Sequence, residues 1–165
     1  MVECLRLAAE STAEVVALTE SDVGWFDDTF PRRLAPLPSG VLFSAGRSVN
    51  SWGSRFEGVY YWGWPIIGSP AAFRKLLSTP EIRAQVGPQY WCHSDRMVTR
   101  LSELTYTELR PLFGTMEAPV SAVGYGLGAA VRSIRAGACI FHALKTVAYY
   151  ESARSEFLRS RAGLV

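Results

Sequence analysis

The sequence contains few of the residues from which metal and thiol sites are usually built. It has three cysteines, Cys4, Cys92 and Cys139, without a CxxC pair, and two histidines, His93 and His142. Isolated cysteines in an odd number argue against a disulfide-stapled secreted scaffold and favour a reducing compartment. Because zinc ligands would have to come from scattered positions, we expect no bound metal.

Long hydrophobic runs are also missing. Charged residues interrupt the N-terminal segment from Glu3 to Glu14, which argues against a secretory signal peptide. The longest weakly polar stretch, residues 118–131, is only about 14 residues long and is too short to cross a bilayer. We therefore expect a cytoplasmic protein, and peripheral contact with a membrane stays open.

A large excess of charge of either sign is absent as well. The chain has 17 Lys and Arg residues against 15 Asp and Glu residues, a net charge of +2. Such a balance provides no whole-molecule field that would hold nucleic acid or an anionic membrane. With 165 residues, 48% of them hydrophobic, the chain is expected to form a single domain over residues 1–165 with one sizeable core.

Turn residues and short apolar segments predict an α+β fold with a small antiparallel sheet packed on helices. Two helix starts are marked by an N-cap residue followed by proline, at Ser69 and at Thr79, and Thr105 with Glu108 fits a capping box. We expect strands over 41–44 and 56–62, joined by a polar link at 46–54, and helices over 7–20, 71–78, 81–86 and 108–113 and from about residue 120 towards the end.

A glycine-rich segment from Gly124 to Ala129 fits the pattern GxGxxA. The dinucleotide-binding form of this motif needs a preceding strand and a surrounding parallel sheet. Few strand-like segments are present, so we interpret the glycines as close packing of a helix and expect no cofactor.

Cys139 is the strongest candidate for a reactive group. It lies in the segment RAGACIFHAL, where Gly137 can open a helix and leave Cys139 in the first turn. The helix dipole would then favour its thiolate. Burial in the core is the preferred interpretation, since free cysteines are among the most buried residues. His142 follows three residues later on a similar face, which is a poor arrangement for a catalytic dyad.

Arginines make the C-terminal third of the chain basic. With aromatic residues of the segment 60–64 as a stacking platform, they would suit single-stranded RNA. A solvated helix face together with a core strand is the simpler interpretation, and no nucleic-acid-binding motif is present. The arginines proposed as a binding surface are Arg132, Arg135, Arg154, Arg159 and Arg161.

Three segments together resemble a known family. They are PSGVLF at 38–43, EGVYYWG at 57–63 and ACIFHAL at 138–144. In order and spacing this layout is similar to the H-box/NC proteins, the permuted papain-like family of the lecithin:retinol acyltransferase type, which includes some picornaviral 2A proteins. The resemblance implies a core of that type over 36–150, preceded by a helix and loop at 1–35 and followed by a basic extension at 151–165.

The resemblance also has departures at its catalytic positions. Glu57 stands where the family has its catalytic histidine, and Ala138 replaces the asparagine before the cysteine. Ser69 lies near the position of a second polar partner, which is often histidine in the family. An anion facing a thiol disfavours the thiolate, so the resemblance implies loss of the usual acyl-transfer chemistry.

Three functions follow from these observations. The first is a non-enzymatic, viral-type interaction protein on a degenerate H-box/NC scaffold, binding host or viral protein partners in the host cytoplasm. The second is a cysteine-dependent acyltransferase or hydrolase with Cys139 as the nucleophile. The third is a small RNA-binding accessory protein. The oligomeric state and the reactivity of Cys139 stay open at this stage.

Overall fold

A computed structural model describes residues 2–19, 23–27, 35–44, 46–50, 58–62, 65–78, 94–111, 131–132, 134–135, 139–141 and 146–163. Contacts group the chain into two compact units, residues 1–19 with 31–114 and residues 20–30 with 115–165. The single domain expected from the chain length stays a prediction, because two such units can belong to one domain. Each unit is described by itself below.

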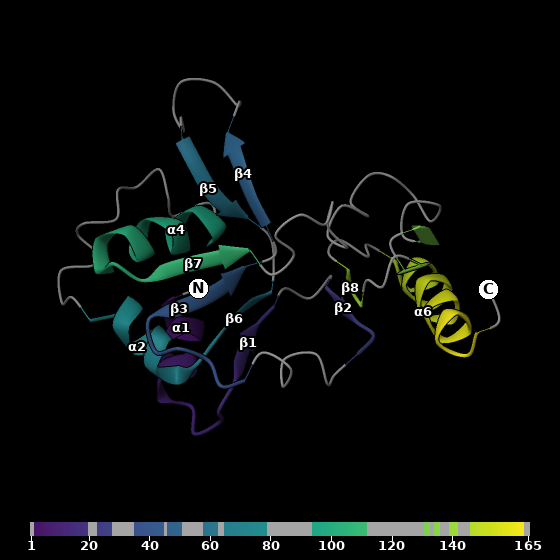
Figure 1. The fold of residues 1–165 in the computed structure, drawn as a ribbon, viewed down its shortest axis with the longest axis horizontal. Helices are drawn as coiled ribbons and strands as arrows, with labels where there is room; N and C mark the ends of the chain where they lie inside the picture. Colours follow the sequence, from purple (N-terminus) through teal and green to yellow (C-terminus); the bar gives the residue numbers. More distant parts are fainter. Residues whose placement is uncertain are drawn as a thin grey trace. The chain divides into compact units, whose positions relative to one another are not determined.

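The first unit is built on a four-stranded sheet with the strand order β1-β6-β3-β7 (Figure 1). β6 pairs antiparallel with both β1 and β3, whereas β3 and β7 run parallel. A second sheet pairs β4 with β5 antiparallel. The strands are β1 (Val16–Leu18), β3 (Val41–Ser44), β4 (Gly46–Asn50), β5 (Gly58–Trp62), β6 (Ile66–Gly68) and β7 (Glu108–Pro111).

The α+β class is confirmed, but the main sheet is mixed rather than antiparallel. The connection between β3 and β7 is long and includes β6 and two of the described helices. Parallel pairing of two strands requires such a long connection, which a tight hairpin cannot provide.

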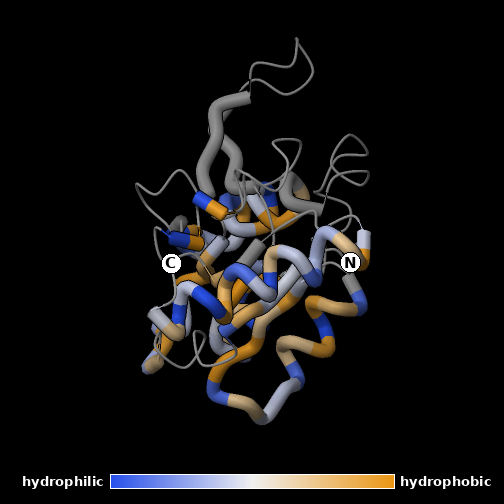
Figure 2. The backbone as a smooth tube through the Cα atoms, turned by 90° about the vertical axis from the view of Figure 1, so that its right-hand side faces the viewer, coloured by the Kyte–Doolittle hydropathy of each residue, from blue (hydrophilic) through white to orange (hydrophobic). Residues whose placement is uncertain are grey.

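The helices described in this unit are α1 (Val2–Glu10), α2 (Pro70–Leu76) and α4 (Ser94–Thr105). α1 packs on α2, and α2 contacts β3, β6 and α4. Figure 2 shows apolar and polar residues alternating along the helix next to the N label, as expected for a helix that is buried on one side. The largest fully buried side chains are those of Leu5, Leu42, Pro65, Ile67, Phe73 and Leu76.

The predicted start of α2 is confirmed in detail. Ser69 has extended backbone angles, φ −76° and ψ 154°, and its Oγ accepts a hydrogen bond from the Ala72 amide at 3.2 Å. Pro70 occupies the first helical position, where a missing N–H costs nothing. The hydroxyl of Ser69 therefore caps a helix.

Three sequence-based expectations were wrong in this unit. The first helix ends at Glu10, and part of the expected helix 7–20 forms strand β1. The first half of the polar link at 46–54 is strand β4. The capping box at Thr105 does not start a helix, because Thr105 ends α4 and the Glu108 amide donates to the Gly40 carbonyl at 2.8 Å, next to β3. The helix expected at 81–86 lies outside the described residues.

The second unit contains a short antiparallel pair, β2 (Gly24–Trp25) with β8 (Ile140–Phe141), and the helix α6 (Val147–Arg161). The hydroxyl of Thr146 caps α6 by accepting from the Tyr149 amide at 3.2 Å. The Phe26 ring lies 5.3 Å from the Tyr150 ring and 5.6 Å from the Phe157 ring, so α6 packs on the segment after β2.

The C-terminal helix expected from the sequence is confirmed at 147–161, whereas residues 140–141 are strand. Within the described ranges, none of the helices combines the length and the apolar character that crossing a bilayer requires.

Candidate functional site

Cys139 is buried, with 3% of its surface exposed, and it directly precedes β8. Its carbonyl accepts a hydrogen bond from the Phe26 amide at 2.9 Å, which extends the β2–β8 pairing by one residue. The expectation that Cys139 lies in the first turn of a helix was wrong, because its backbone belongs to this pairing. The expected stabilisation of its thiolate by a helix beginning at Gly137 therefore loses its basis.

The other two residues of the proposed catalytic set, His142 and Glu57, lie outside the described residues. Their relation to Cys139 thus stays a prediction. Among the described residues, no group of three histidine, cysteine or acidic side chains could hold a metal ion.

The C-terminal arginines are placed by α6 and its neighbours. Glu156 is a buried carboxylate with 6% of its surface exposed, and it accepts hydrogen bonds from Arg135 at 3.2 Å and from Arg159 at 2.7 Å. Both arginine side chains stay more than half exposed, so they shield the carboxylate at the surface. A buried carboxylate needs such partners, because burial without them would be costly.

Arg161 is engaged as well. It donates to Asp27 at 3.1 Å, and its guanidinium lies 5.3 Å from the centre of the Phe157 ring. Arg132 and Arg154 are exposed, and neither forms an ion pair in the described part of the chain. Arg135 and Arg161 thus tie α6 to neighbouring segments, and Arg159 bonds within the helix; in the part of the chain that the structure describes, Arg132 and Arg154 are the two of the five without an ion pair.

Tyr149, near the start of α6, has a hydroxyl that is buried without a hydrogen-bond partner in the described part of the chain. Burial raises the pKa of Tyr149. Because the folded state disfavours its ionisation, any contribution of this group to stability is present below its ordinary pKa and is lost as the pH rises through the raised value.

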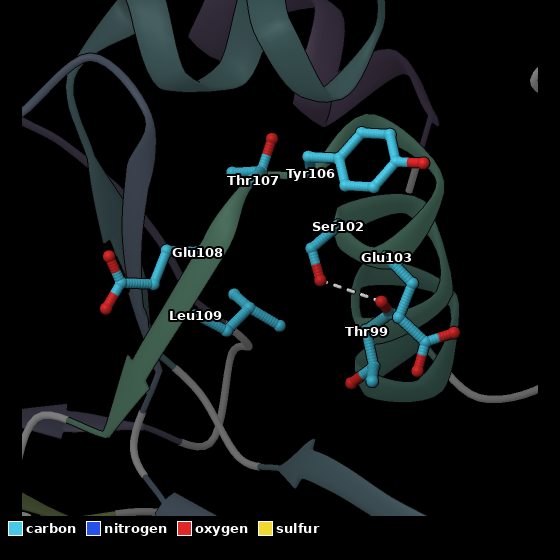
Figure 3. Close-up of a pocket in the computed structure, with 7 residues that line it drawn as sticks. All are labelled: Thr99, Ser102, Glu103, Tyr106, Thr107, Glu108 and Leu109. Atoms are coloured by element: carbon cyan, nitrogen blue, oxygen red, sulfur yellow. Dashed lines mark hydrogen bonds between the residues drawn. The ribbon is translucent and has the colours of Figure 1, made fainter.

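A pocket that sequence reasoning missed lies between α4 and β7 (Figure 3). Its volume is about 450 Å³, within the range of ligand-binding clefts. In Figure 3, Leu109 points from the strand towards the helix, and the Tyr106 ring stands at one end. The lining residues are Thr99, Ser102, Glu103, Tyr106, Thr107, Glu108 and Leu109.

Several polar groups around this pocket already form hydrogen bonds or ion pairs. Ser102 donates to the Thr99 carbonyl at 2.7 Å, and the hydroxyls of Thr105 and Thr107 lie 2.9 Å apart. The two carboxylates form exposed ion pairs, Glu103 with Arg100 and Glu108 with Arg110. The hydrogen bond from Arg110 lowers the pKa of Glu108. Among the described residues, the lining consists of hydroxyl, carboxylate and apolar side chains.

Tyr106 closes α4 with a Schellman motif. The Thr107 amide donates to the Ser102 carbonyl at 2.9 Å, and the Tyr106 amide donates to the Glu103 carbonyl at 3.4 Å. The first residue after a helix that ends in this way is normally glycine, because its φ is positive. Here that residue is Tyr106, with φ 52°. The Lys75 ammonium donates to the Tyr106 carbonyl at 2.6 Å and holds the turn. Because 89% of the Tyr106 surface is exposed, burial of its side chain contributes little stability to offset the backbone strain.

Replacing Tyr106 with glycine is expected to raise the free energy of unfolding by about 1 kcal/mol, because glycine adopts a positive φ without steric cost. Urea denaturation followed by circular dichroism measures the change. Tyr106→Ala is the matched control: it removes the same ring but keeps a Cβ, so it should give no comparable gain. A glycine variant less stable than the native chain would contradict the assignment of strain to this residue.

Comparisons with protein-family models, with curated proteins and with solved structures gave no match to this chain.

Proposed function

We propose that this protein is a non-enzymatic interaction protein on a degenerate H-box/NC-like scaffold, of the kind that binds host or viral protein partners. The observation that carries the proposal is the burial of Cys139. At 3% exposure, with its backbone carbonyl in the β2–β8 pairing, Cys139 presents little surface to a substrate, which supports a role without a nucleophilic sulfur. An acyltransferase or hydrolase using this cysteine would need an accessible thiolate.

The surface features also favour a protein partner over RNA. RNA binding depends on arginines that are free to contact phosphates. Here Arg135 and Arg159 are hydrogen-bonded to the buried Glu156, and Arg161 to Asp27. The pocket between α4 and β7, with an exposed tyrosine at its end, supports a binding role because tyrosine is enriched at protein interfaces.

A turnover assay with thioester, carboxyl-ester and phospholipid substrates tests this proposal. We expect the native chain and Cys139→Ala to give the same background hydrolysis. Cys4→Ala serves as the matched control because Cys4 is an exposed free cysteine. Turnover that disappears in Cys139→Ala and persists in Cys4→Ala would overturn the proposal and establish the cysteine-dependent enzyme.

A further inference from the structure

Strand β7 lies at the edge of the main sheet. Among the described strands it pairs with β3 alone. The Glu108 amide donates to the Gly40 carbonyl at 2.8 Å, so the backbone groups of Glu108 point towards β3. Since these groups alternate in direction along a strand, those of Arg110 also point towards β3, and the N–H and C=O of Leu109 point outwards.

Over the described residues 107–111, the outer edge of β7 offers one backbone donor. On either side of Leu109, the next outward positions are Thr107 and Pro111. The Thr107 amide already donates to the Ser102 carbonyl at 2.9 Å, and proline has no N–H. A strand added at this edge can therefore exchange a complete pair of hydrogen bonds only at Leu109, which fixes its register.

The side chains around Leu109 carry opposite charges. Glu108 and Arg110 share one face of the strand and bond to each other at 2.7 Å and 2.9 Å, and both side chains are about half exposed. If an antiparallel strand is centred on Leu109, its residue opposite Glu108 should be basic and its residue opposite Arg110 should be acidic. Read from its own N-terminus, the best-matched partner is acidic, apolar, basic, which is the order Glu108, Leu109, Arg110 itself.

We propose that β7 is a self-association edge, where a second copy of this chain adds its own β7 antiparallel across a two-fold axis. The two Leu109 residues exchange both backbone hydrogen bonds, and each Glu108 faces Arg110 of the second copy. This is an isologous contact, with the same surface on both copies. The pocket beside Leu109 and the exposed Tyr106 ring adjoin this edge (Figure 3). The inference is independent of the argument from Cys139.

The proposal predicts a weak dimer, because one pair of backbone hydrogen bonds and two exposed ion pairs form a small, transient type of interface. Sedimentation equilibrium of the full chain from about 10 µM to about 1 mM covers the affinities expected of such contacts. We expect Glu108→Arg alone and Arg110→Glu alone each to weaken dimerisation by about tenfold or more, because like charges then face each other twice.

Mixing supplies the decisive arm of this experiment. When the Glu108→Arg chain is combined with the Arg110→Glu chain, every cross-strand pair is again of opposite sign, so we expect a heterodimer as strong as the native dimer. The double exchange Glu108→Arg with Arg110→Glu should likewise self-associate. Circular dichroism confirms that each variant is folded, and the double variant tests the edge even where one single variant folds poorly.

Glu10→Arg on α1 is the matched control, since it makes the same charge change on an exposed side chain of a helix that packs on α2 and β1. It should leave the association unchanged. A native chain that stays monomeric to about 1 mM would overturn the proposal and leave this edge for a different partner. Loss of association that mixing does not restore, or an equal loss with Glu10→Arg, would also overturn it.

Discussion

Truncating Leu42 to alanine is expected to lower the free energy of unfolding by about 3 kcal/mol. Leu42 is completely buried and lies on β3, the strand that pairs with both β6 and β7. In the sheet it stands opposite Gly68 on one side and Leu109 on the other. The Leu42 side chain and the Phe73 ring of α2 both lie close to Gly68.

The neighbouring glycine makes this prediction sharper. A Cβ added at Gly68 would overlap the Leu42 Cδ2 atom and would lie 3.4 Å from Phe73. Both side chains are completely buried and have little room to move, so Gly68→Ala should cost about 2 kcal/mol by overpacking. In the double variant, the new methyl group enters the space that Leu42→Ala vacates, and the clash disappears.

A double-mutant cycle measured by urea denaturation checks this contact. We expect the double variant to be more stable than the two single effects predict, with a coupling of about 1–2 kcal/mol. Ala72→Gly, on α2, together with Leu42→Ala provides a control pair in which no such overlap is relieved. Additive effects of Gly68→Ala and Leu42→Ala would contradict the close approach of β6 to Leu42.

Local signals in the sequence predicted those elements whose ends are fixed by neighbouring residues. The N-cap at Ser69 with Pro70 placed the start of α2 correctly, because the capping bond reaches only three residues. The strand at 41–44 was also predicted correctly from four consecutive residues between turn signals. In both cases the physical cause lies within the segment.

Elements that depend on distant partners were predicted wrongly or missed. Thr105 and Glu108 fit a helix start, yet Glu108 joins the sheet because the Gly40 carbonyl, far away in the sequence, accepts its amide hydrogen bond. The helix α4 was not predicted, and its end carries no glycine signal because Tyr106 occupies the position where glycine usually marks a helix end. The pocket between α4 and β7 depends on both of these features, so it could not be predicted from the sequence.

The candidate site shows the same division. The sequence identified the C-terminal arginines and placed them near a helix, but it did not reveal that Glu156 is buried between Arg135 and Arg159. The Arg135 contact spans 21 residues, and no local pattern indicates it. For Cys139, burial was the preferred expectation and is confirmed, whereas the helix expected around it is replaced by the pairing of β8 with β2.

The accessibility of Cys139 is the central claim behind the proposed function. Cys4 is exposed and Cys139 is buried, so the chain carries its own reference thiol. Reaction of a buried thiol requires local opening of the structure, and we expect protection of about 100-fold or more relative to an exposed cysteine. If Cys139 were an activated nucleophile, it would react faster than an exposed cysteine, since its thiolate has to be available to a reagent.

The direct measurement is the rate of iodoacetamide labelling at neutral pH, resolved for each cysteine by mass spectrometry of the digested chain. The account predicts that Cys4 is labelled at the rate of a free thiol, that Cys139 is labelled about 100-fold more slowly, and that unfolding in urea makes the two rates similar. Labelling of Cys139 in the native chain as fast as Cys4, or faster, would contradict the account.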